Sequence, residues 1–68
     1  MKVEWHGNTR CDFCGKECQH DLYDGKTIWG SWAVMCKTCF RKNGEGLGKG
    51  RGQRYRKQED DAFVKCEG

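Results

Sequence analysis

Long apolar stretches are missing from this 68-residue chain. Hydrophobic residues make up 35% of the sequence and charged residues 34%, and no apolar run approaches the roughly 18 residues that a membrane-spanning helix needs. The first six residues contain no apolar core of the kind that marks a secretory signal. The sequence therefore predicts a cytoplasmic protein that neither spans nor binds a membrane.

The chain also has too little apolar material for a large core. A domain of this size buries roughly 60% of its unfolded surface, so apolar burial alone scarcely offsets the lost conformational entropy. Phosphate-loop motifs are absent as well, because Lys49 is followed by Gly50 and no GxGxxG pattern fits. We expect no enzyme and no small-molecule substrate, and we expect the fold to need a covalent or metal cross-link.

Six cysteines supply that cross-link. Four of them form Cys11-x-x-Cys14 and Cys36-x-x-Cys39, two pairs separated by 21 residues. Two residues between cysteines let both thiolates reach one ion, and two such pairs complete the tetrahedral sulfur shell that suits Zn²⁺. A disulfide framework is the alternative, but the missing export signal favours a reducing compartment. We predict one structural Zn²⁺ at Cys11, Cys14, Cys36 and Cys39.

Two cysteines and both histidines stay outside this predicted site. Cys18 and His20 follow the first pair closely, so an alternative ligand set can be written with them. The simpler interpretation makes Cys18 and Cys66 ordinary small thiols and His6 and His20 ordinary polar residues. Their roles are not fixed by the sequence.

The residues around the cysteine pairs predict the fold. Gly15 allows the chain to leave the first pair through a left-handed conformation, and the second pair opens a short helix with Gly44 just past its end. Asp24-Gly25 predicts a two-residue hairpin turn between strands at 19–23 and 26–35. This order is that of a treble clef, in a small zinc-stabilised α+β fold. A zinc ribbon, with its second pair on another hairpin, is the alternative.

The second predicted strand indicates where the core lies. Ile28, Trp32 and Val34 share one face of that strand, and we expect the core to centre on Trp32. The other predicted core members are Phe13, Leu22 and Phe40. Trp29 lies on the opposite face, which makes it the candidate for contact with a partner protein.

Charge divides the chain into segments. Residues 1–40 are neutral overall, residues 41–57 carry +6, and residues 58–68 carry −3. We therefore predict an N-terminal arm at 1–10, a four-cysteine domain at 11–43, a glycine-rich basic arm at 44–57 and an acidic tail at 58–68. Glycine at every second position from 44 to 52 fits either a flexible linker or an extended segment with one bare edge. The conformation of 58–68 is not decided by the sequence.

Three stretches of the sequence together carry a resemblance. They are Cys11-x-x-Cys14-Gly15-Lys16, then Asp24-Gly25-Lys26-Thr27-x-x-Gly30-x-Trp32-Ala33-x-Met35-Cys36, then Gly46-Leu47-Gly48-x-Gly50-x-Gly52-Gln53-x-Tyr55. In these stretches the chain resembles small four-cysteine zinc-finger proteins encoded by bacteriophages, most of them without assigned function. The resemblance implies a phage origin, the same four-cysteine site and action in the cytoplasm of a bacterial host. It implies no activity.

Two functions fit these features. In the first, the basic segment binds nucleic acid, with cations on phosphates and an aromatic ring stacked on a base. The residues predicted for this role are Arg41, Lys42, Lys49, Arg51, Arg54, Tyr55, Arg56 and Lys57. In the second, the chain binds a host protein through Trp29 and arm residues, since Trp, Tyr and Arg dominate interface hot spots. Catalysis is not expected, because four thiolates leave no open position on zinc.

Overall fold

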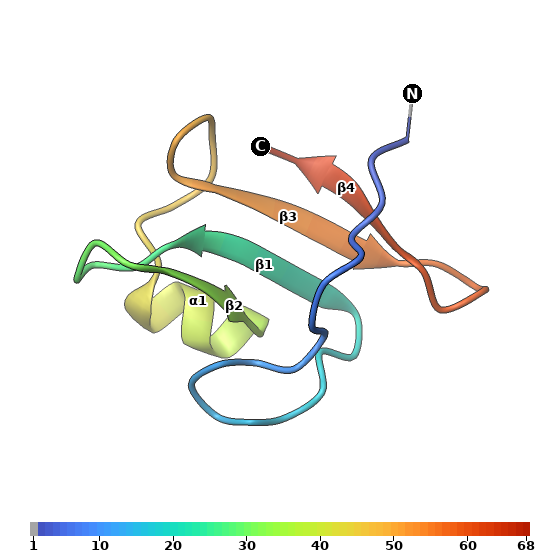
Figure 1. Cartoon of the computed structure of the whole chain (residues 1–68), viewed down its shortest axis with the longest axis horizontal. Coiled ribbons are helices and arrows are strands. Elements are labelled where there is room, and N and C mark those ends of the chain that lie inside the picture. The colour runs from blue at the N-terminus through green and yellow to red at the C-terminus, as the bar shows by residue number, and fades with distance from the viewer. Residues whose placement is uncertain (1) are drawn as a thin grey trace.

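The computed structural model describes residues 2–68 and shows a small α+β fold, as predicted. The elements in chain order are β1 (Asp21–Lys26), β2 (Trp32–Met35), α1 (Lys37–Asn43), β3 (Gly52–Lys57) and β4 (Phe63–Glu67). All neighbouring strands are antiparallel, and their order in the sheet is β2-β1-β3-β4 (Figure 1). Within the described residues, no helix is both long enough and apolar enough to cross a membrane.

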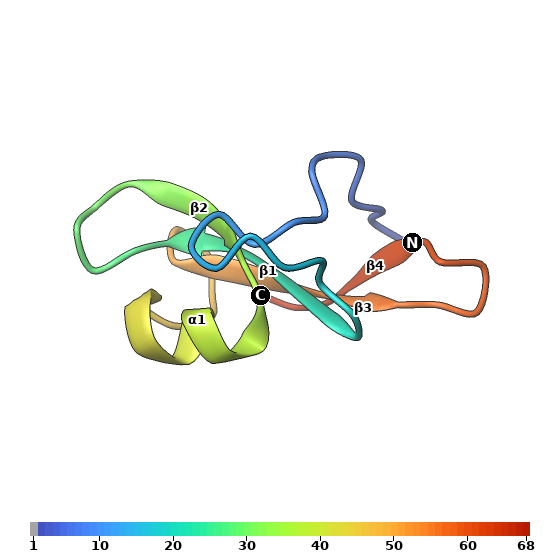
Figure 2. The ribbon, with the colours of Figure 1, turned by 90° about the horizontal axis from the view of Figure 1, so that it is seen from below.

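Both faces of the sheet are covered. Helix α1 lies against one face, and the N-terminal segment crosses the other (Figure 2). Leu22 and Tyr23 are adjacent in β1, so their side chains point to opposite faces, yet both are buried. On the helix side the buried residues are Tyr23, Met35 and Phe40. On the other side they are Cys18, Leu22, Val34, Tyr55 and Phe63. The protein therefore has two small apolar clusters, one on each side of a single sheet.

The predicted hairpin turn is wrong. Asp24 and Gly25 lie inside β1, and the chain instead turns between β1 and β2, where Gly30 has a φ of +95°. Gly25 serves close packing, because a Cβ at this position would lie 3.2 Å from the ring of Phe40 and 3.3 Å from the Cα of Gly52. The glycine that predicts a turn in the sequence therefore allows close packing between β1, β3 and α1 instead.

The predicted centre of the core is also wrong. Trp32 is 48% exposed, Ile28 is 59% exposed and Phe13 is 45% exposed. Strand β2 begins only at Trp32, so Ile28 belongs to the turn and does not share a strand face with it. Met35 lies on the face of β2 opposite to Val34 and is fully buried, because α1 covers that side. The remaining predicted core residues, Leu22, Val34 and Phe40, are buried.

The two C-terminal segments complete the sheet. Strand β3, residues 52–57, lies between β1 and β4, and β4 takes up five of the eleven residues 58–68. Residues near the N-terminus then follow the outer edge of β4: the backbone N–H of Trp5 donates to Phe63 O at 2.9 Å, and Lys65 N–H donates to Val3 O at 2.7 Å. The sheet thus ties both ends of the chain together.

Residues 44–51, which we call the glycine loop, are folded and not an extended strip. Gly46, Gly48 and Gly50 have φ values of +119°, +131° and +79°. The backbone N–H of Gly48 donates to Gly52 O at 2.9 Å, and Gly52 N–H donates back to Gly48 O at 3.0 Å. The alternating glycines therefore supply the left-handed conformations of a tight loop that leads into β3.

Gly44 is needed because a larger residue would clash with Phe40, and not because the helix ends in a left-handed conformation. Its φ is −83°, and its N–H donates to Phe40 O at 2.8 Å. A Cβ here would lie 2.5 Å from Cδ1 of Phe40, so we expect Gly44→Ala to destabilise the fold by about 1–3 kcal/mol through overpacking. Urea denaturation measures this, with exposed Lys42→Ala as the control that stays within about 0.5 kcal/mol. Wild-type stability in Gly44→Ala would contradict the packing argument.

Candidate metal centre

The fold brings the four predicted cysteines together. The Sγ atoms of Cys11, Cys14, Cys36 and Cys39 all lie within 4.8 Å of one another. The Sγ atoms of Cys14 and Cys36 are 3.8 Å apart, and sulfurs placed about 2.3 Å from a central ion at tetrahedral corners lie roughly 3.8 Å apart. This cluster could therefore hold a metal ion. All six cysteines, which lie within the described residues, are free thiols.

The first pair lies in a tight turn at residues 11–15, which we call the knuckle. The backbone N–H of Gly15 donates to Cys11 O at 3.0 Å, and Cys11 N–H donates to Lys16 O at 2.9 Å. Gly15 has a φ of +75°, the left-handed exit that the sequence predicts. The bridge between Arg10 and Glu17 closes the base of this turn. The knuckle therefore fixes Cys11 and Cys14 locally.

The second pair lies where β2 passes into α1. Cys36 directly precedes the helix and its carbonyl accepts the Phe40 N–H at 2.9 Å, while Cys39 lies in the first turn. Both thiols thus lie at the N-terminal end of the helix, where the helix dipole is positive. Arg41 and Lys42 occupy the last turn, as the sequence predicts.

Asp12 joins the two halves of the site, a role that sequence reasoning missed. Its backbone N–H donates to Val34 O at 2.8 Å, and its carboxylate Oδ2 accepts the Val34 N–H at 2.8 Å. These two bonds cap the outer edge of β2 and hold the knuckle beside the strand that leads to Cys36. In the sequence, Asp12 is only a hydrogen-bond acceptor between two cysteines. Nothing in the neighbouring residues indicates that it would bond to β2.

The thiols differ in their protonation. Burial of Cys11 raises its pKa, but backbone hydrogen bonds from Cys14, Cys36 and Phe13 outweigh burial and lower that pKa to about 6. Burial and the neighbouring cysteine side chains raise the pKa of Cys39 to about 12. The cluster on its own thus favours a mixture of thiolate and thiol, and binding of a metal cation would release the remaining protons.

The residues left outside the predicted site also lie outside the cluster. Cys18 is 1% exposed, its Sγ donates to Met35 O at 3.8 Å, and burial together with the charge of Cys11 raises its pKa to about 12. It is a core thiol. Cys66, His6 and His20 are exposed.

Tyr55 does not fit the role of a stacking residue. It is 7% exposed, and its ring centroid lies 5.4 Å from that of Trp5. Because β3 is an interior strand, the Tyr55 ring belongs to the apolar cluster under the N-terminal segment. The prediction that this ring stacks on a base is wrong for the folded protein.

The basic residues of β3 have acidic partners. Arg54 Nε lies 3.3 Å and Arg56 Nε 3.4 Å from Oδ1 of Asp21, and Arg54 also pairs with Glu67. Lys57 Nζ lies 3.6 Å from a carboxylate of Asp61. Much of the charge in this half of the basic segment is thus balanced within the sheet. The other predicted cations, Arg41, Lys42, Lys49 and Arg51, are exposed.

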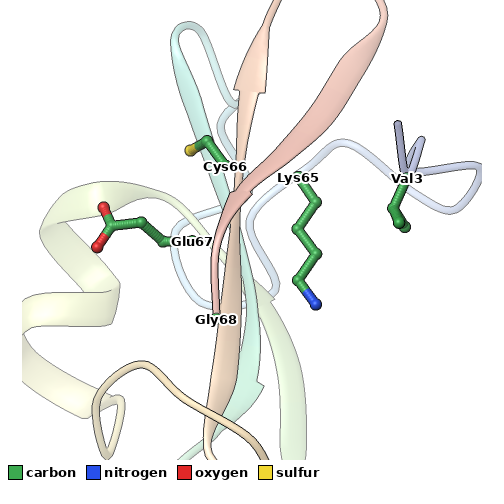
Figure 3. Close-up of a pocket in the computed structure, with 5 residues that line it drawn as sticks. All are labelled: Val3, Lys65, Cys66, Glu67 and Gly68. Atoms are coloured by element: carbon green, nitrogen blue, oxygen red, sulfur yellow. The ribbon is translucent and has the colours of Figure 1, made fainter. Parts of the chain in front are cut away.

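Surface hollows open on the described part of the chain. One, of about 290 Å³, is next to β4; Figure 3 shows Cys66 and Glu67 on one side of the strand and Lys65 and Val3 on the other. These side chains do not converge on a common point. Another hollow, of about 330 Å³, opens beside the cysteine cluster, with Cys36 in its wall. Its other lining residues are polar or carry charges of both signs.

Comparison with known proteins adds nothing to what the geometry shows. No protein family, no curated protein and no solved structure matches this chain. The assignment below therefore rests on the cysteine cluster and on the surfaces around it.

Proposed function

We propose that the chain is a small non-catalytic module in which Cys11, Cys14, Cys36 and Cys39 hold one structural Zn²⁺. The observation that carries this proposal is the approach of all four Sγ atoms to within 4.8 Å of one another. Four thiolates in a tetrahedral arrangement suit Zn²⁺, and they close its coordination shell, so no position is left for a catalytic water.

The order of elements supports a treble-clef-like assignment. A knuckle, the β1–β2 hairpin and a helix that begins beside the second cysteine pair follow one another along the chain. A zinc ribbon would place that second pair on another hairpin, whereas Cys39 lies in α1. The resemblance to small phage zinc-finger proteins adds the proposal of a phage origin and of action in the cytoplasm of a bacterial host.

The module acts, we propose, by binding nucleic acid through four exposed cations: Arg41, Lys42, Lys49 and Arg51. The ion pairs among residues 2–68 engage Arg54, Arg56 and Lys57 but none of these four. Exposed cations without carboxylate partners are free to displace counterions from a phosphate backbone. Binding of a host protein is the second candidate, favoured by the 66% exposure of Trp29.

Salt dependence of binding tests the nucleic-acid proposal. If the four cations each contact one phosphate, changing them all to Gln should lower the log–log salt slope by about 3 on single strands, at roughly 0.7 per phosphate. Titration of a labelled oligonucleotide from about 50 mM salt upward measures the slope. The matched control changes Arg56 and Lys57 to Gln, where we expect a smaller effect because both are paired.

Absence of binding to single and double strands at tens of micromolar protein, roughly the weak limit of non-specific binding, would contradict the nucleic-acid proposal. Retention of one host protein by the wild-type chain and not by Trp29→Ala would then support the second candidate. The zinc assignment does not depend on either outcome.

A further inference from the structure

Exposed aromatic rings gather where the knuckle meets the β1–β2 turn. Trp29 is 66% exposed and Phe13 is 45% exposed, and their ring centroids are 5.9 Å apart with the planes inclined by 38°. Ile28 and Trp32, in the same turn and at the start of β2, are also exposed. The two apolar clusters of this chain are small, yet Trp29 and Trp32 remain exposed to water. Large apolar side chains grouped on a surface in this way indicate a binding site.

Cations lie at the same end of the molecule. Ile28 N–H donates to Asn43 O at 2.8 Å, and Lys26 N–H donates to Arg51 O at 2.7 Å. The first bond ties the turn to the end of α1, and the second ties the end of β1 to the glycine loop. The left side of Figure 1 shows the turn and α1 at the same end of the molecule. The adjoining segments, residues 24–29 and 41–51, carry Lys26, Arg41, Lys42, Lys49 and Arg51 against Asp24 and Glu45, a net charge of +3.

Several acidic residues outside these two segments are engaged with other groups. Asp21 and Glu67 pair with arginines of β3, and Asp61 pairs with Lys57. The Asp12 carboxylate accepts the Val34 N–H, and Glu17 accepts the Thr9 hydroxyl. Asp21, Glu67 and Asp61 are thus balanced by cations of β3. Asp12 and the thiolates of the cysteine cluster keep their negative charge beside Phe13, so the positive charge at this end of the molecule comes from residues 41–51.

We infer that this surface binds single-stranded nucleic acid and that Phe13 and Trp29 form its stacking platform, an inference that rests on the proposed nucleic-acid function. A single strand presents both a line of negative charge and open base faces, and it therefore complements cations and flat rings together. A duplex offers the charge but hides the base faces in its stack. A purely apolar protein patch would complement the rings but would gain nothing from the cations.

The platform is built from two segments that the metal centre helps to hold. Phe13 lies between the two cysteines of the knuckle, and the hydrogen bonds of Asp12 to Val34 fix the knuckle against β2. Trp29 reaches the same place from the turn that precedes β2. Rings fixed in this way lose little freedom when a base stacks on them, which favours binding.

Fluorescence anisotropy of labelled oligothymidylate, beside a labelled duplex of equal length, tests this inference. We expect tighter binding to the single strand, and we expect Trp29→Ala to weaken it by about 5- to 150-fold, the usual range for loss of one stacked base. The salt slope should not change, because the substitution removes no cation. Trp29→Phe should restore most of the affinity.

The matched control is Val3→Ala, which removes an exposed apolar side chain at the opposite edge of the sheet and should leave binding unchanged. Equal affinity for duplex and single strand, or wild-type affinity in Trp29→Ala, overturns the stacking platform while salt-dependent binding keeps the proposed function. Loss of salt-dependent binding to both forms overturns the proposed function itself. Because Trp29 is exposed, dispersed amide resonances should show that the variants remain folded.

Discussion

Replacing Cys39 by Ser is expected to unfold the protein. The Sγ of Cys39 is one of the four that lie within 4.8 Å of one another, and a serine hydroxyl is a poor substitute for a thiolate on Zn²⁺. Binding to a structural zinc site is worth on the order of 10–16 kcal/mol, which matches or exceeds the whole stability of an ordinary domain. Loss of dispersed amide resonances, together with loss of bound zinc, measures the effect.

The same loss is expected for Ser at Cys11, Cys14 or Cys36. Cys66→Ser is the matched control, since Cys66 is exposed and lies outside the cluster. Cys18→Ser should keep the metal as well, because Cys18 lies in an apolar cluster and outside the group of four sulfurs. Metal loss in Cys18→Ser with metal retained in Cys39→Ser would show that the ligand set is wrong.

Phe40→Ala is expected to destabilise the fold by about 3–5 kcal/mol. The Phe40 ring stacks on Tyr23 with centroids 4.3 Å apart and planes inclined by 12°, and Gly25 and Gly44 pack directly against it. Truncation leaves a cavity between α1 and the sheet that these backbone atoms cannot fill. Urea denaturation of the zinc-loaded protein gives the change in the free energy of unfolding.

Trp32→Ala provides the comparison for Phe40→Ala. Both are large aromatic side chains, but Trp32 is 48% exposed whereas Phe40 is 9% exposed. We therefore expect a clearly smaller loss for Trp32→Ala, although the sequence alone places this residue at the centre of the core. A larger loss at Trp32 than at Phe40 would contradict the core described above.

The cysteine cluster could be predicted because its signal is local. Two residues between cysteines define a turn, Gly15 provides its exit, and Cys36 and Cys39 fall at the start of a helix whose end carries Arg41 and Lys42. Each feature depends on neighbours within a few positions. The sequence did not reveal that Asp12 would meet Val34, because that contact joins residues from different elements.

The strand pairing could not be predicted, since it depends on distant partners. Gly25 is a turn residue by local rules, yet it lies in β1 because Gly52 and Phe40 approach it closely. Arg56 belongs to a basic run by local rules, yet Asp21, 35 positions away, pairs with it. In the sequence alone, the run Arg54-Tyr55-Arg56-Lys57 is equally compatible with a nucleic-acid contact and with an interior strand.

Native mass spectrometry of the purified protein, with amide spectra recorded before and after chelation, tests the central claim most directly. The account predicts one zinc ion per chain, and collapse of the dispersed spectrum when the metal is removed. A chain that carries no metal and keeps its dispersed amide resonances after chelation would contradict it.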